Sequence, residues 1–135
     1  MSDGMEKVLF SCVSVAVGFS LGIASKPLQE YFELIKEIRR ALIEYANCYG
    51  GLAKKEKTEK ASEKYREFSG RLASVPHMSL YWLYRWLNQV PDKEQLLEAK
   101  TRFIGMSNVI YTDDFEAIHK TEERIRRCLG LEAGE

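Results

Sequence analysis

An uncharged run near the N-terminus restricts the folds open to this chain more than any other feature. Residues Val8 to Ser25 carry no charged side chain and lie between Lys7 and Lys26. As a helix the run rises roughly 27 Å, close to the roughly 30 Å hydrocarbon core of a bilayer. It also lacks the polar face that a helix on the surface of a small domain needs. The sequence therefore predicts a transmembrane anchor over residues 1–26 and a helical domain over residues 27–135.

Two alternatives to a retained span remain open. Gly22-Ile23-Ala24 has the small-x-small pattern of a signal-peptide cleavage site, which favours removal of the segment. Against this, the residues before the run are slightly acidic, whereas a signal peptide begins with a basic segment. A buried core helix is the second alternative, and the missing polar face disfavours it. We expect the span to be retained, with the bilayer as its partner.

The charges that flank the run predict its orientation. The side chains before it are slightly acidic, while Lys26, Lys36, Arg39 and Arg40 follow it closely. Basic residues next to a span stay on the cytoplasmic side. We therefore expect a single-pass protein of the cell inner membrane with a cytoplasmic C-terminal domain.

The rest of the chain predicts an all-α fold, a single N-terminal transmembrane helix followed by a small antiparallel helical bundle. Apolar residues recur in steps of three and four, the period of a buried helix face. A first seam continues from the span, past Pro27, to a stop at Gly50-Gly51, and three further helices follow. The first seam holds Leu28, Tyr31, Ile35, Ile38, Leu42, Tyr45 and Tyr49. The second helix is expected to bury Ala61, Tyr65, Phe68, Leu72 and Val75, and the third Leu96, Ala99, Phe103, Met106 and Ile110. The last helix is expected to bury Phe115, Ile118, Ile125 and Leu129 and to be capped by Asp113.

Two faces of the first helix predict self-association. Ser14, Gly18 and Gly22 recur every four residues, and small residues at this spacing let two membrane helices approach closely. The heptad seam after the span offers a second contact, for which the candidate residues are Tyr31, Ile35, Ile38 and Leu42. We expect a homo-oligomer, coiled-coil-like in this region, that could also bind a protein partner.

The aromatic segment 80–87, Leu-Tyr-Trp-Leu-Tyr-Arg-Trp-Leu, is apolar on every side, with Ser79 as its expected cap. Such a segment must be buried in the bundle, in a subunit contact or at the bilayer surface. Its Tyr and Trp content resembles the aromatic belt of membrane proteins. We favour the core or a subunit contact, because aromatic residues of soluble domains usually pack inside.

Several short blocks resemble uncharacterised short bacterial proteins that have one N-terminal transmembrane helix and a cytoplasmic helical domain. The resemblance covers most of the chain and implies its architecture but no activity. The blocks are Tyr45 to Tyr49, Arg71 to Pro76, Val90-Pro91, Phe103 to Asn108 and Ile125 to Leu131.

The chemistry-bearing residues predict no catalytic, cofactor or metal site. Twenty basic and twenty acidic residues give zero formal charge, which makes nucleic acid an unlikely partner. Arg71 and His77 fit the loose Arg-x(4–6)-His spacing of HEPN-like ribonucleases, but Pro76 interrupts the helix between them. We expect a membrane-anchored oligomeric helical interaction module, a scaffold or regulator, without catalytic activity. The alternatives are an oligomeric membrane pore or defence effector, and a HEPN-like ribonuclease that uses Arg71 and His77.

Overall fold

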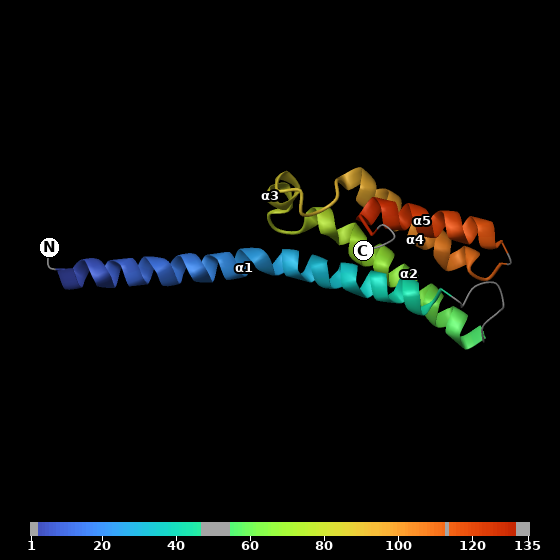
Figure 1. The fold of residues 1–135 in the computed structure, drawn as a ribbon, viewed down its shortest axis with the longest axis horizontal. Coiled ribbons are helices and arrows are strands. Elements are labelled where there is room, and N and C mark those ends of the chain that lie inside the picture. The colour runs from blue at the N-terminus through green and yellow to red at the C-terminus, as the bar shows by residue number, and fades with distance from the viewer. Residues whose placement is uncertain (1–2, 47–54, 113, 132–135) are drawn as a thin grey trace.

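The computed structural model describes residues 3–46, 55–112 and 114–131, and over these ranges the chain is all-helical (Figure 1). The elements are α1 (Asp3–Glu44), α2 (Lys55–Ser74), the 3-10 turn η1 (Val75–His77), α3 (Tyr81–Trp86), α4 (Lys93–Val109) and α5 (Phe115–Leu129). The N-terminal half of α1 projects alone, while its C-terminal half lies along α2. The structure confirms an all-α chain in which a long apolar N-terminal helix precedes a small packed bundle.

Helix α1 runs through Pro27 without interruption for 42 residues, roughly 63 Å. Pro27 has no N–H and cannot donate to the carbonyl of Ile23, one turn earlier. Nearby polar groups bond locally: the Ser25 hydroxyl lies 3.1 Å from the Gly22 carbonyl oxygen, and Gln29 Nε2 lies 3.2 Å from Ser25 Oγ. The apolar half is thus joined to the bundle by continuous helix and not by a linker, as the sequence predicted.

The C-terminal half of α1 supplies one wall of the core. Tyr31, Leu34, Ile38 and Leu42 are buried, whereas the predicted seam residue Ile35 is only partly buried. The buried residues fall at positions 31, 34, 38 and 42, so Leu34 is buried more deeply than Ile35, which packs at the edge of the core. The last helical hydrogen bonds give way to a turn at Tyr45 and Ala46. Tyr49, Gly50 and Gly51, where the sequence predicted the end of this helix, lie outside the described residues.

Helices α2 and α4 form the centre of the bundle. Tyr65 and Phe68 of α2 and Phe103 of α4 are fully buried, and the Phe103 ring centroid lies 5.7 Å and 5.6 Å from those of Tyr65 and Phe68. Two small polar residues line the same contact: Ser62 Oγ donates to the Ser107 carbonyl at 2.8 Å, and Ser69 Oγ donates to the Lys100 carbonyl at 3.1 Å. A serine at a helix contact brings the backbones close while its hydroxyl stays satisfied.

The later helices begin and end through local chemistry. Asp92 caps α4 in a reciprocal capping box with Gln95, with bonds of 2.8 Å and 3.2 Å. Helix α5 is capped by Asp114, which accepts from the Ala117 N–H at 3.0 Å, so the cap lies one residue later than predicted. Gly130 ends α5 with a φ of 70°, a conformation that favours glycine.

For one residue of the predicted α5 seam, the prediction of burial was wrong. Phe115 is about half exposed, because it occupies the first position of α5, beyond the part of the helix that α4 covers. The remaining seam residues of α5, and all those predicted for α2 and α4, are buried.

Removing the Phe103 side chain tests the assignment of the core. Phe103→Ala leaves a cavity between two aromatic rings, and we expect it to lower the free energy of unfolding by about 3–5 kcal/mol. The neighbouring Ile104 is exposed, so Ile104→Ala is the matched control and should cost less than about 1 kcal/mol. Denaturant unfolding of the full chain in mild detergent, followed by circular dichroism, measures both. Equal losses would contradict the packing.

Candidate membrane interface

The first half of α1 is apolar and entirely exposed. Among the described residues, α1 is the one helix long and apolar enough to cross a membrane, and none of its apolar window is buried by the rest of the chain. A core helix of a soluble domain would bury such a window. The exposed side chains are Met5, Val8, Leu9, Phe10, Val13, Val15, Val17, Phe19, Leu21 and Ile23. By length, composition and place in the chain, this half of α1 could be a membrane anchor or a signal sequence.

The small-residue face predicted for self-association lies within this exposed half. Ser14 is exposed, and a Cβ added at Gly18 or Gly22 would meet no other side chain of the described chain within 4 Å. Neither glycine is therefore explained by close packing inside the chain. The face is free for a lipid tail or for a second helix.

The heptad seam, by contrast, is used inside the chain. Ile38 and Leu42 are completely buried, Tyr31 nearly so, and Ile35 is partly covered. These residues pack with α2 and its neighbours in a single copy of the chain. Bundle packing alone thus accounts for the seam, and no second copy is needed to explain its pattern.

The short helix α3 divides the aromatic segment between two environments. Tyr81 and Tyr84 are buried, while Trp82 and Trp86 are 70% and 78% exposed. The helix begins after Leu80, whose φ of 61° is left-handed, and not at a Ser79 cap. Packing in the core is therefore wrong for the two tryptophans, while a subunit contact through them stays a prediction. A six-residue helix presents one face to the bundle, and the tyrosines occupy it.

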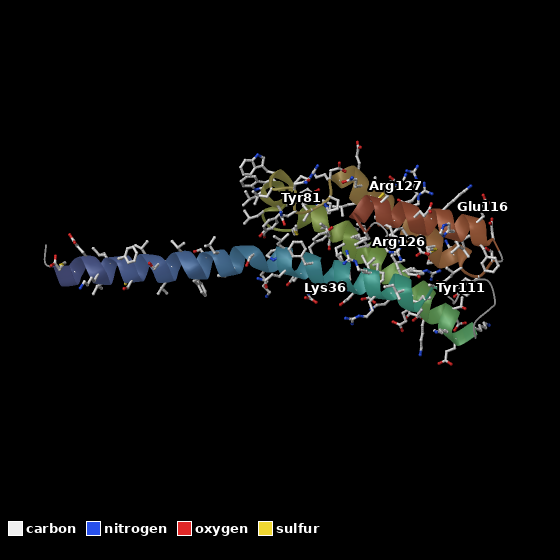
Figure 2. The ribbon with its side chains drawn as sticks, viewed as in Figure 1. Lys36, Tyr81, Tyr111, Glu116, Arg126 and Arg127 are labelled. Atoms are coloured by element: carbon white, nitrogen blue, oxygen red, sulfur yellow. The ribbon has the colours of Figure 1, made fainter. Side chains whose placement is uncertain are left out.

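Tyr81 places α3 next to the part of α1 that leaves the bundle. Burial raises the pKa of Tyr31 far above its usual range, and the charge that Tyr81 would carry raises it further. Tyr31 also lines one hollow together with Arg85 of α3, so the two helices lie close to each other there. Burial also raises the pKa of Tyr81, whose hydroxyl donates to the Pro91 carbonyl at 2.7 Å. In Figure 2, Tyr81 lies at the end of the bundle nearest the projecting half of α1, and Tyr111 lies at the far end.

Arg71 and His77 do not converge on one site. Arg71 pairs with Glu37 of α1 and, at 3.7 Å, with Glu67 of its own helix. It lines a hollow next to Pro27 and Tyr31, whereas the exposed His77 lines a separate hollow with Pro76, Lys93 and Lys100. The Arg71 guanidinium therefore ties α1 to α2 and is not presented to a shared cavity with His77.

His119 and Lys120 of α5 are likewise engaged in pairs within their own helix. His119 lies 3.2 Å from Glu123 and Lys120 lies 3.0 Å from Glu116. Exposed pairs one helical turn apart contribute little beyond the stability of the helix itself. Within the described ranges, no three His, Cys, Asp or Glu side chains gather as a metal site would require.

No protein-family model matches the chain, and neither does any curated protein or solved structure. The resemblance to short bacterial membrane proteins therefore stays a prediction. Function has to be argued from the surfaces described above.

Cys128 provides a test of how α5 is seated. Burial raises the pKa of its thiol from the usual 9.0 to about 11, and a hydrogen bond to the Glu98 carboxylate acts in the same direction. Because the thiolate is the reactive form, the folded protein should hold Cys128 unreactive near neutral pH. In Cys12→Ser/Cys48→Ser protein, we expect maleimide labelling only after unfolding or as the pH approaches about 11. The control is a Ser74→Cys thiol in a cysteine-free background. Position 74 is exposed, so this thiol should react at once. Equal rates for the two thiols would contradict the packing of α5.

Proposed function

We propose that the chain is a membrane-anchored helical interaction module, a scaffold or regulator without catalytic activity. The observation that carries this proposal is the division of α1, an uninterrupted helix with one wholly exposed apolar half and one half buried in the bundle. Such a helix fits a span that continues directly into a folded domain. A bilayer would cover the apolar half, which the bundle leaves bare.

The energetics favour insertion over exposure to water. Each apolar side chain contributes favourably in a membrane, about 0.3–0.6 kcal/mol for Leu, Ile, Phe or Val near the helix centre. In water the same half-helix would expose a continuous apolar surface, far beyond the few hundred Å² found on soluble monomers. The basic residues Lys26, Lys36, Arg39 and Arg40 favour a cytoplasmic bundle and a single pass through the inner membrane.

The proposed module self-associates through the membrane. Gly18 and Gly22 leave the backbone of α1 open to a close neighbour on the face that also holds Ser14. The seam residues buried in the bundle have no free surface to add to this contact. The exposed surface of the bundle is then left to bind a protein partner.

Neither alternative function has a specific observation in its favour. A pore would need a polar lining, and the candidates in the span are only Ser11, Ser14 and Ser20. A ribonuclease of the HEPN type would need Arg71 and His77 at one site, whereas they line separate hollows.

A matched pair of charge substitutions on α1 tests the anchor. Val15 and Ile43 are exposed to similar extents, 72% and 68%, but only Val15 lies in the proposed span. An aspartate at the centre of a membrane helix costs about 2.5–3.5 kcal/mol. We expect the full chain and Ile43→Asp to stay in the membrane pellet after alkaline carbonate washing, and Val15→Asp to be released in part. Recovery of the unchanged chain in the supernatant would contradict the proposed anchor.

The mass of the protein recovered from membranes separates an anchor from a signal sequence. A retained span gives the full 135-residue chain. A product that lacks the residues up to Ala24 would show cleavage and would place the bundle outside the cytoplasm.

Substitution of Gly18 tests self-association. Gly18→Ile adds a branched side chain to the small-residue face, and we expect it to weaken helix pairing by about 1–2 kcal/mol, the scale of interhelical contacts in lipid. Ala16→Ile adds the same side chain on the opposite face of the helix and is the matched control. Cross-linking in membranes measures pairing, and circular dichroism checks that the bundle is intact. If both variants cross-link like the unchanged protein, the small-residue face is not a contact.

A further inference from the structure

Trp82, Trp86 and Leu87 form an exposed apolar surface on and just after α3, called here the tryptophan patch. The two indoles are four residues apart and therefore lie on the same side of the helix. With Trp82 70% and Trp86 78% exposed, the two side chains present on the order of 300 Å² of largely apolar surface. Two neighbouring tryptophans left this bare in a small bundle indicate a binding surface.

Buried tyrosines and hydrogen bonds on the inner side of α3 fix the orientation of the tryptophan patch. On the inner side of α3, Tyr81 and Tyr84 are buried and the Tyr81 hydroxyl donates to the Pro91 carbonyl. Arg85 Nη1 bonds to the Asn88 side-chain oxygen at 3.1 Å and to the Val90 carbonyl at 3.4 Å. These hydrogen bonds join α3 to the residues that follow it, and the two buried tyrosines pack the helix on the core. The indoles are therefore presented by an ordered scaffold.

The patch lies at the end of the bundle from which the apolar half of α1 emerges. Tyr31, one helical turn after Pro27, lines one hollow together with Arg85 of α3. The chain that leads into α3 also touches this region, because Val75 and Met78 line a hollow together with Pro27. Figure 1 shows α3 as the bundle element beside the start of the projecting part of α1. If α1 spans a bilayer, the patch lies at the level of the membrane surface.

The segment that carries the patch has no acidic side chain. From Phe68 to Pro91 the sequence contains none of the chain's twenty acidic residues. Arg85 of α3 and Lys26, which follows the span, are the basic residues at this end of the bundle, because Arg71 is paired with Glu37 and Glu67. Glu30 and Asp92 lie at the same end, so the contact depends on the two tryptophans and not on an excess of positive charge.

We infer that the tryptophan patch docks into the interfacial layer of the bilayer that α1 spans, giving the bundle a second contact with the membrane. The inference rests on the proposed anchor. Tryptophan favours this layer because its large ring is apolar while its N–H can bond to headgroups or water. The span already confines the patch to the surface, so the second contact forms at high effective concentration. Two contact points fix the tilt of the bundle and which of its faces points away from the membrane.

Fluorescence of the full chain in vesicles tests this contact directly, because Trp82 and Trp86 are the only tryptophans in the sequence. The probes are phospholipids brominated on their acyl chains, which quench from inside the bilayer, and aqueous iodide, which quenches from outside. We expect blue-shifted emission, loss of more than half of the intensity with brominated lipid, and little effect of iodide. The lone tryptophan of Trp82→Phe/Trp86→Phe/Tyr111→Trp, at the far end of the bundle, is the control and should show the reverse pattern.

Three other outcomes would overturn the inference, and they differ in what they leave standing. Protein that floats with the vesicles but is quenched by iodide alone has an inserted α1 and a patch in water. Protein that floats and is shielded from both quenchers has its patch covered by a second copy of the chain. Protein that does not float with the vesicles lacks the anchor, so both the proposed function and the patch contact fail.

Discussion

The continuity of α1 through Pro27 is the constraint on which the rest of the molecule depends. Proline removes one backbone donor, but the helix survives because the neighbouring turns keep their hydrogen bonds and Ser25 bonds locally. Since no flexible linker separates the two halves, the direction of the apolar half determines the direction of the bundle. If the apolar half is anchored in a membrane as proposed, the bundle cannot rotate freely about it.

The packing of α1 decides which surfaces remain for other molecules. Its seam is buried in the bundle, because Ile38 and Leu42 pack in the core together with the aromatic residues of α2 and α4. What remains free on α1 is the apolar half with its two open glycines. The self-association proposed above therefore involves this apolar half, and the exposed surface of the bundle is left for the proposed protein partner. Arg71, which looked like a candidate catalytic residue, instead joins α1 to α2 through Glu37.

Much of the fold could be predicted from periodicity because buried helix faces repeat every three or four residues. That rule placed Tyr65, Phe68, Phe103 and Met106 in the core correctly. It failed where a residue has no neighbour to pack against, as for Phe115 at the start of α5. It also gave no sign of Ser62 and Ser69, whose role depends on carbonyls of another helix and not on local pattern. The proposed membrane contact of α3 was one of three environments that the sequence left open.

By itself the sequence determined the apolar run, the four longer helices and several of their ends. These depend on interactions within a few residues, such as the Asp92–Gln95 capping box or the left-handed Gly130. Only the tertiary structure decided that Leu34 is buried more deeply than Ile35 and that Arg71 and His77 line different hollows. It also decided that Trp82 and Trp86 point outward at the end where α1 emerges. The reason is physical: periodicity shows which residues share a helix face, but burial depends on what lies opposite that face.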